Sequence, residues 1–143
     1  MHYMRMKNKN SFNYAIKTLF VLSALVVMTN CGGKNSGTSL AISLDDFITK
    51  YESASGKIQL LDVRTPDEYN SGHVPGAVLL PVSDLTSGAA VSFEKNSEVY
   101  VICRSGKRSM AAAEYLQSQG FTSVKSVSGG TMAWAGRDKP LDK

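Results

Sequence analysis

The residues most suited to chemistry form one short run, Cys103-Arg104-Ser105-Gly106-Lys107-Arg108-Ser109. An apolar, β-prone stretch over 98–102 precedes this run, and a helix-forming stretch over 109–119 follows it. In an open parallel sheet, ligands bind at the carboxyl ends of the strands, which is where this order places Cys103. A tight loop there turns backbone N–H groups inward, and the next helix adds about half a positive charge at its N-terminus. The run therefore predicts a nucleophilic thiol.

The loop that follows Cys103 is also rich in basic side chains. Arg104, Lys107 and Arg108 supply three cations, and Gly106 permits the positive φ that such a loop often requires. Each feature favours the thiolate, and a cysteine so placed can have its pKa lowered from about 8.5 to roughly 3.5–7.5. The alternative interpretation is a structural cysteine that ends a strand beside a solvated basic loop.

The elements that must position this loop alternate between helices and strands. Helical spacing and capping patterns predict helices over 44–52, 66–70, 109–119 and 131–136. Strands are predicted over 57–63, 98–102 and 121–127, with a further apolar run over 77–81. This alternation predicts an α/β fold, in which helices cover both faces of a parallel sheet.

Three segments, taken in order, give a family resemblance. Residues 61–77 (LDVRTPDEYNSGHVPGA), the loop 103–108 (CRSGKR) and residues 128–134 (SGGTMAW) resemble the signatures of the single-domain rhodaneses, which are sulfurtransferases. The resemblance implies a five-stranded parallel α/β sheet with Cys103 as a catalytic persulfide carrier. It also implies that substrate is bound by the rest of the loop, namely Arg104, Ser105, Gly106, Lys107, Arg108 and Ser109.

The chemistry implied by this resemblance needs no cofactor and no metal. Sulfane sulfur would pass from a small anion such as thiosulfate, through Cys103, to cyanide, a thiol or a thioredoxin-like protein. Cysteine phosphatases, some of them on the same fold, use a longer C-x5-R loop fitted to a tetrahedral phosphate. Here Arg108 gives the pattern C-x4-R, and Ser109 occupies the position of the phosphatase arginine. The shorter loop suits a single sulfur atom, and Gly106 excludes a C-x-x-C exchange pair.

Three further residues are candidates for supporting the pocket. Asp62 ends a strand at the same sheet edge as Cys103, so we expect it to line the pocket or to orient the loop. Arg64 is expected to form a local ion pair with Asp67 or Glu68, of little energetic weight if exposed. His73 is expected in a structural turn rather than as the base of a Cys–His pair.

The first thirty residues have the features of a lipoprotein-type signal peptide. The basic residues of this segment precede an uncharged run over 18–28, which is about half of the ~20 residues needed to span a bilayer. Cys31 is the expected lipid acceptor, and an uncleaved membrane anchor is the alternative. The predicted order is a signal peptide over 1–30, a flexible tether over 31–39, a rhodanese domain over 40–137 and a tail over 138–143. We expect an exported, periplasmic lipoprotein anchored to the membrane.

The net charge does not point to a nucleic-acid partner. The formal charge is +4, but all twelve acidic residues lie after residue 30, and from Cys31 onward basic and acidic residues balance. A protein that binds DNA or RNA needs a net basic surface. The competing function is a membrane-anchored, non-catalytic rhodanese-like module that binds a partner or senses oxidants through an exposed Cys103 of low pKa. In either case we expect a monomer.

Overall fold

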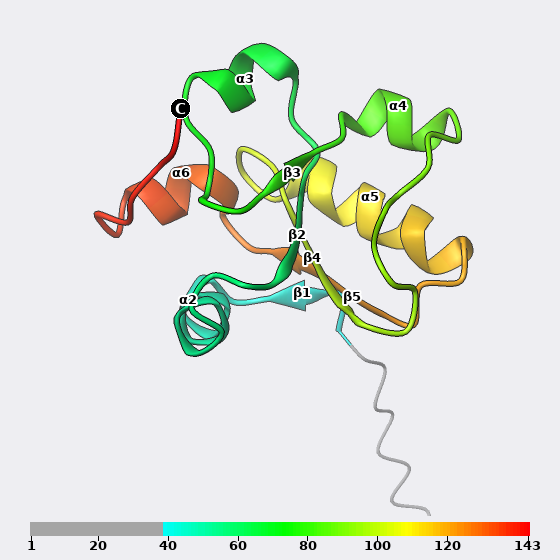
Figure 1. Ribbon diagram of the computed structural model, residues 1–143, viewed down its shortest axis with the longest axis horizontal. Helices are drawn as coiled ribbons and strands as arrows, with labels where there is room; N and C mark the ends of the chain where they lie inside the picture. Colours follow the sequence, from blue (N-terminus) through cyan, green and yellow to red (C-terminus); the bar gives the residue numbers. More distant parts are fainter. Residues whose placement is uncertain (1–38) are drawn as a thin grey trace, which may run out of the picture. The chain divides into compact units, whose positions relative to one another are not determined.

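The computed structural model describes residues 39–143, which form a five-stranded parallel sheet (Figure 1). The predicted signal peptide and Cys31 lie outside the described residues. The strands are β1 (Ala41–Ile42), β2 (Gln59–Asp62), β3 (Val78–Leu79), β4 (Glu98–Ile102) and β5 (Ser123–Val127). They are arranged in the order β1-β5-β4-β2-β3, and every neighbouring pair is parallel. The expected sheet is therefore confirmed.

Helices cover both faces of this sheet, as the alternating pattern predicted. The helices are α2 (Leu44–Ser53), α3 (Pro66–Asn70), α4 (Val82–Thr86), α5 (Lys107–Ser118) and α6 (Gly130–Ala135). Helices α4 and α5 lie on one face of the sheet, and α2 and α6 lie on the other (Figure 1). Their buried side chains belong to two separate core clusters. Among the described residues, no helix is both long and apolar enough to cross a membrane.

Strand β4 lies at the centre of the sheet and carries the core on both of its faces. Its last four residues are buried, with Val99 and Val101 in the cluster beneath α5 and Tyr100 and Ile102 in the cluster beneath α2 and α6. This burial on two faces agrees with the nearly continuous apolar sequence of the strand. Because β4 is held from both sides, the residue that follows it, Cys103, starts from a rigid position.

The structure also contains elements that the sequence analysis did not identify. The edge strand β1 and the helix α4 were both missed, since two residues and five residues carry too little periodicity to be recognised. Helix α5 begins at Lys107, two residues earlier than predicted, because Gly106 adopts a φ of 102° and occupies its N-cap. Lys107, Arg108 and Ser109 are therefore the first turn of a helix rather than loop residues.

The C-terminal segment over 138–143 packs against the domain. The indole Nε1 of Trp134 donates to the carbonyl of Pro140 at 2.9 Å. The backbone of Asp142 pairs with the backbone of His73 through two hydrogen bonds, each 2.9 Å long. These contacts bring the predicted tail next to α3 and α6, with consequences for the site described below.

Helix α6 begins in close contact with the end of β4. Gly130 has a φ of 57°, and a Cβ atom added to it would lie 2.2 Å from the carbonyl oxygen of Cys103. No pair of non-bonded heavy atoms tolerates that distance, and the obstacle is backbone rather than a flexible side chain. A glycine is therefore required here by close approach as well as by conformation.

We expect Gly130→Ala to destabilise the fold by about 4 kcal/mol or more, as judged by urea unfolding. Gly88→Ala is the matched control, because Gly88 has a φ of 94° but an added Cβ atom there would meet no heavy atom within 4 Å. The free energy of unfolding of that variant should fall by only about 1–2 kcal/mol, which is the cost of placing a residue with a Cβ atom in the left-handed backbone conformation. Equal losses in the two variants would contradict the proposed contact between α6 and Cys103.

Candidate active site

Cys103 lies at the carboxyl end of β4, at the sheet edge predicted from the sequence. The start of α6 holds its backbone, since the amide of Thr131 donates to the Cys103 carbonyl at 2.8 Å. The amide of Met132 donates in the same way to the Arg104 carbonyl at 3.1 Å. In the sequence, residues 128–134 were recognisable only as a family signature. The structure shows that this segment determines where the loop backbone lies.

The Cys103 thiol is buried, with only 1% of the residue exposed. The amide of Gly106 donates to Sγ at 3.1 Å. Burial by itself raises the pKa of the thiol. Hydrogen bonds from the hydroxyl and amide of Ser109, and from the amides of Ser105 and Gly106, lower the pKa, and the overall shift is downward. The predicted direction agrees, and so does one predicted cause, the backbone N–H groups of the loop, whereas no basic side chain is among the causes that lower this pKa.

Ser109 has a buried partner that the sequence analysis missed. Its Oγ lies 2.8 Å from Oγ of Ser126, on the neighbouring strand β5, and 3.0 Å from the Gly106 carbonyl. Ser126 is 2% exposed. Because the Ser109 hydroxyl donates to the Gly106 carbonyl, its oxygen can accept the proton of the Ser126 hydroxyl. The available signal was the position of Ser126 two residues after Val124, because alternate residues of a strand lie on the same face and Val124 is buried.

Arg108 is paired with a carboxylate instead of projecting freely over the loop. Its guanidinium donates to both carboxylate oxygens of Glu68, at 2.6 and 2.7 Å. Glu68 also completes a capping box with Thr65 at the start of α3. The Arg108 hydrogen bond is the largest of the causes that hold the pKa of Glu68 at about 2, so this carboxylate is ionised at neutral pH. The pair ties the first turn of α5 to α3.

The expected ion pair between Arg64 and Asp67 or Glu68 is wrong. Arg64 is only 6% exposed, and its guanidinium binds both carboxylate oxygens of Asp62 at 2.7–2.9 Å. It also donates to the Gly72 carbonyl at 2.9 Å. A buried guanidinium needs a buried carboxylate to compensate its charge, and Asp62 is fully buried. Asp62 therefore orients Arg64 and not the Cys103 loop.

His73 makes contacts away from the Cys103 loop. Its ring stacks on Tyr69 with centroids 3.7 Å apart, and Nδ1 lies 3.1 Å from the Tyr69 carbonyl. Its backbone pairs with that of Asp142. These are the contacts of a structural residue, because every hydrogen-bond partner of His73 lies outside the loop.

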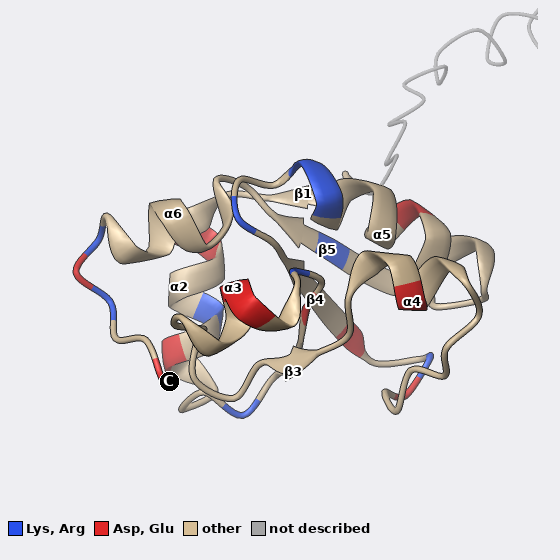
Figure 2. Ribbon diagram, turned by 90° about the horizontal axis from the view of Figure 1, so that it is seen from above, with Lys and Arg blue, Asp and Glu red and all other residues tan. Residues whose placement is uncertain are grey.

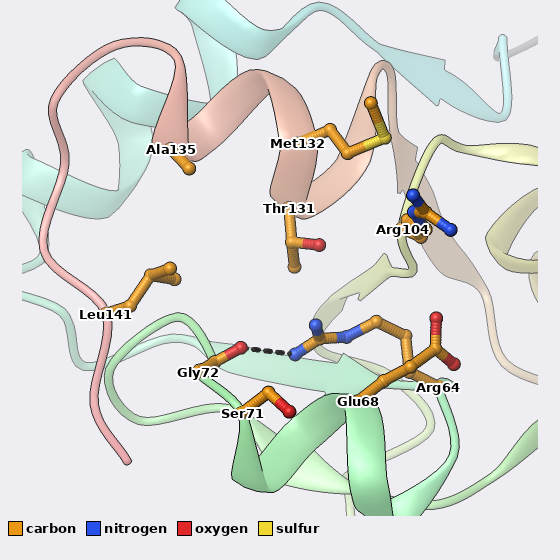
Figure 3. Close-up of a pocket in the computed structure, with 9 residues that line it drawn as sticks. All are labelled: Arg64, Glu68, Ser71, Gly72, Arg104, Thr131, Met132, Ala135 and Leu141. Atoms are coloured by element: carbon orange, nitrogen blue, oxygen red, sulfur yellow. Dashed lines mark hydrogen bonds between the residues drawn. The ribbon is translucent and has the colours of Figure 1, made fainter.

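A cavity of about 340 Å³ adjoins the loop, between α3, α6 and the C-terminal segment (Figure 3). Arg104 and Glu68 line it beside the polar Ser71, and Met132 and Leu141 are among its apolar lining residues. Figure 2 shows the basic first turn of α5 and the acidic ribbon of α3 near this end of the sheet. The cavity therefore combines charged and apolar walls next to the residue that follows Cys103.

The described residues offer no metal site and one thiol. Within residues 39–143, no three histidine, cysteine or carboxylate side chains are grouped so that they could hold a metal ion. Cys103 is the free cysteine of this part of the chain. Cys103 is buried, whereas the oxidant-sensing alternative assumed an exposed thiol. A buried thiol whose pKa is lowered and which accepts a hydrogen bond from the Gly106 amide can carry negative charge on sulfur.

Comparisons with known proteins identify the same region. A profile of the Rhodanese-like domain matches residues 48–137. YtwF of Bacillus subtilis, provisionally named a sulfurtransferase, is 41% identical over 87 residues, which are 61% of this chain and 82% of YtwF. YrkF of the same organism, provisionally named a sulfur carrier protein, is 36% identical over 110 residues and 74% of this chain. The chain spans only 58% of the length of YrkF.

Solved structures show the same fold. A rhodanese-like domain protein from Staphylococcus aureus superimposes with a TM-score of 0.62 at 33% identity, covering 71% of this chain and 95% of that one. The human single-domain sulfurtransferase TSTD1 superimposes with a TM-score of 0.61 at 28% identity, covering 69% of this chain and 97% of that one. These similarities extend over most of the described residues.

We expect Ser109→Ala to raise the pKa of Cys103, because the variant loses a hydroxyl that stabilises the thiolate. The rate of alkylation by iodoacetamide, measured against pH, should reach its plateau at a higher pH. At pH 7 it should be about tenfold slower than in the natural protein. Ser105→Ala is the control, since its exposed side chain is removed while the amide remains, and its pH midpoint should not move. An unchanged midpoint in Ser109→Ala would exclude the hydroxyl as a cause of the low pKa.

Proposed function

Because this chain belongs to the rhodanese-like domain family, with relatives named as sulfurtransferases, we propose that it transfers sulfane sulfur from thiosulfate or a similar anion through Cys103. The observation that carries the proposal is the environment of Cys103 Sγ. It lies at the end of β4 with the Gly106 amide 3.1 Å away and hydrogen bonds that lower its pKa. A thiolate held in this way is a nucleophile that needs no separate general base.

The first step forms a persulfide. The Cys103 thiolate attacks the outer sulfur of thiosulfate, and a new S–S bond forms as the sulfur–sulfur bond of the donor breaks. The electron pair of the broken bond leaves with sulfite. The product is Cys103–S–S⁻, and the total charge is unchanged. The loop amides that face Sγ are suited to stabilise the terminal charge.

The second step returns the cysteine to its starting state. A nucleophile such as cyanide or a thiolate attacks the terminal sulfur, the bond between the two sulfur atoms breaks, and its electron pair returns to Cys103 Sγ. No oxidant, reductant or cofactor enters either step. Arg104 and Lys107 are both exposed and are proposed to attract the anionic donor.

The structure gives a further reason to prefer sulfur transfer to phosphate-ester hydrolysis. Only Arg104, Ser105 and Gly106 separate Cys103 from the first residue of α5. Arg108, the arginine of the C-x4-R pattern, is held by both oxygens of Glu68. A phosphatase needs an arginine free to bind two oxygens of a tetrahedral phosphate. A loop this short, with its arginine engaged, favours a smaller group.

We also propose that the protein is exported and anchored through a lipid on Cys31. The support is the sequence alone, namely the basic segment, the short apolar run over 18–28 and the cysteine that follows it. A lipoprotein carries more than one acyl chain on this cysteine, and a single chain would hold a protein only marginally.

Incubation with thiosulfate should add the mass of one sulfur atom to the peptide that contains Cys103, and cyanide should remove it. Cys103→Ser is expected to abolish the gain and to reduce thiocyanate formation by at least about a thousandfold, because the nucleophile is lost. Circular dichroism should show that the variant stays folded. Cys31→Ser, which changes the other cysteine of the chain, should retain transfer. Transfer that persists without Cys103 would refute the proposed mechanism, and an absence of transfer in the natural protein would favour a non-catalytic module.

Cys31→Ala tests the anchoring proposal. The variant should leave the membrane fraction or keep its signal segment, because the acceptor for lipid is missing. The measurement is membrane fractionation followed by the intact mass of the protein. A mature protein that stays in the membrane unchanged would show instead that the apolar run is itself the anchor.

A further inference from the structure

Strand β5 carries a buried hydroxyl on the face that packs against α5. Ser126 lies two residues after Val124, which belongs to the core cluster beneath α5. The backbone of Ser126 is held from both sides, opposite Val101 of β4 and Ala41 of β1. Neither this strand pairing nor the packing of the core needs a hydroxyl at the position. Because burying a hydroxyl without a partner is costly, its partner indicates what it does.

The partner of the Ser126 hydroxyl is the first turn of α5. In the described part of the chain it forms a single hydrogen bond, with Oγ of Ser109 at 2.8 Å. Ser109 is fully buried and Ser126 is 2% exposed, so bulk water satisfies neither hydroxyl. The Ser109 proton is directed to the Gly106 carbonyl at 3.0 Å, which leaves the Ser109 oxygen able to accept. Ser126 is therefore the donor in this pair and Ser109 the acceptor.

The Ser109 hydroxyl has a second acceptor in the sulfur of Cys103. Hydrogen bonding from this hydroxyl is among the causes that lower the pKa of the thiol. A charged acceptor forms a hydrogen bond about twice as strong as a neutral one, so the thiolate competes with the Gly106 carbonyl for the Ser109 proton. When the proton turns to the sulfur, the carbonyl still accepts the amide of Met110 at 3.1 Å. Both arrangements leave the carbonyl and the Ser109 oxygen with a partner.

Ser126 is the donor to Ser109 in both arrangements. A hydroxyl whose oxygen accepts a hydrogen bond is polarised by it, and its own proton is donated more strongly. We propose that Ser126 is a positioning residue for sulfur transfer, which holds the Ser109 hydroxyl as a donor to the ionised sulfur of Cys103. This inference rests on the proposed function. Ser126 acts only through Ser109, and both serines keep their protons throughout.

The charged groups around the loop are the same whether or not Ser126 carries its hydroxyl. Those of β2, α3 and the first turn of α5 include two ion pairs, Arg64–Asp62 and Arg108–Glu68. Arg104 and Lys107 are exposed. Residues Gly130–Ala135 of α6 contribute no charged side chain, and Lys125 of β5 donates to the Ser39 carbonyl. A change in the titration of Cys103 on substitution of Ser126 therefore reports hydrogen bonding rather than an altered charge.

The test measures the rate of alkylation by iodoacetamide against pH in the full chain. The modification is followed on the peptide that contains Cys103, so that Cys31 does not contribute. Ser126→Ala should move the midpoint of the profile to higher pH, because Ser109 then donates less strongly to the thiolate. Below the midpoint the variant should react about threefold more slowly than the natural protein, and above it the two rates should agree. An unchanged midpoint overturns the proposal.

A double variant shows whether Ser126 acts through Ser109. Ser109→Ala/Ser126→Ala should have the same midpoint as Ser109→Ala alone, because the hydroxyl that Ser126 holds is already absent. If the shifts of the two single variants add in the double variant, Ser126 acts independently and the proposal is overturned. Ser123→Ala is the matched control, since Ser123 belongs to the same strand but lies opposite Glu98, at the end of β4 remote from Cys103. It should keep the natural midpoint.

Ser126→Thr and Ser126→Val separate the hydroxyl from packing, because the two side chains have nearly the same shape and only threonine can donate. The valine variant should shift the midpoint as Ser126→Ala does, and the threonine variant should shift it less. Equal shifts in the two variants would show that packing is the cause and would overturn the proposal. Urea unfolding of each variant establishes that it is folded, and if Ser126→Ala is not, this second pair decides.

The loading of sulfur from thiosulfate is measured on the same proteins. Ser126→Ala should load about threefold more slowly below the alkylation midpoint and at the natural rate above it, since the thiolate is the form that attacks the donor. If the midpoints shift as expected but the natural protein gains no sulfur, the proposed function fails and the role of Ser126 toward the thiol stands. If sulfur is loaded but the midpoint does not move, the role of Ser126 fails alone.

Discussion

The position of the Cys103 loop depends on one backbone contact between two elements that are distant in the sequence. The amides of Thr131 and Met132 bind the carbonyls of Cys103 and Arg104, and the approach is so close that only a glycine fits at position 130. This contact fixes the loop from the side of α6, while β4 fixes it from within the sheet. The location of Sγ, the path of the loop into α5 and the adjoining cavity all follow from these two constraints.

Two of the arginines near the Cys103 loop are paired with carboxylates, so they do not form a cluster of free positive charges around the sulfur. The basic residues of the loop do not surround the sulfur as three free cations, because Arg108 is held by Glu68. Arg64 is likewise held by Asp62 within the protein. The thiol is stabilised as an anion chiefly by hydrogen bonds from Ser109 and the loop amides, which act in a buried setting where such bonds are strong. Arg104 is left available for a ligand.

The C-terminal segment over 138–143 packs against the domain and forms part of the cavity wall. Residues 138–143 lie beyond the domain limits predicted from the sequence. The backbone pairing of Asp142 with His73 and the hydrogen bond from Trp134 to the Pro140 carbonyl hold this segment so that Leu141 lies in the cavity wall. His73 and Trp134 therefore act at a distance from the sulfur, by holding the segment that carries Leu141. Their importance to the site is positional, which distinguishes them from residues that face the loop.

The sequence by itself determined the class of fold, the place of Cys103 at the end of a central strand and the need for Gly106 at positive φ. These properties depend on local pattern and on the order of elements along the chain, as the buried run 98–102 and the helix after it illustrate. Elements as short as β1 and α4 were not predictable, since a few residues carry no period. Partners were decided by tertiary structure. Burial and packing bring together residues whose separation in sequence carries no information about contact. The resulting contacts are the ion pairs Arg64–Asp62 and Arg108–Glu68, the hydrogen bond between Ser109 and Ser126, and the position of Leu141 in the cavity wall.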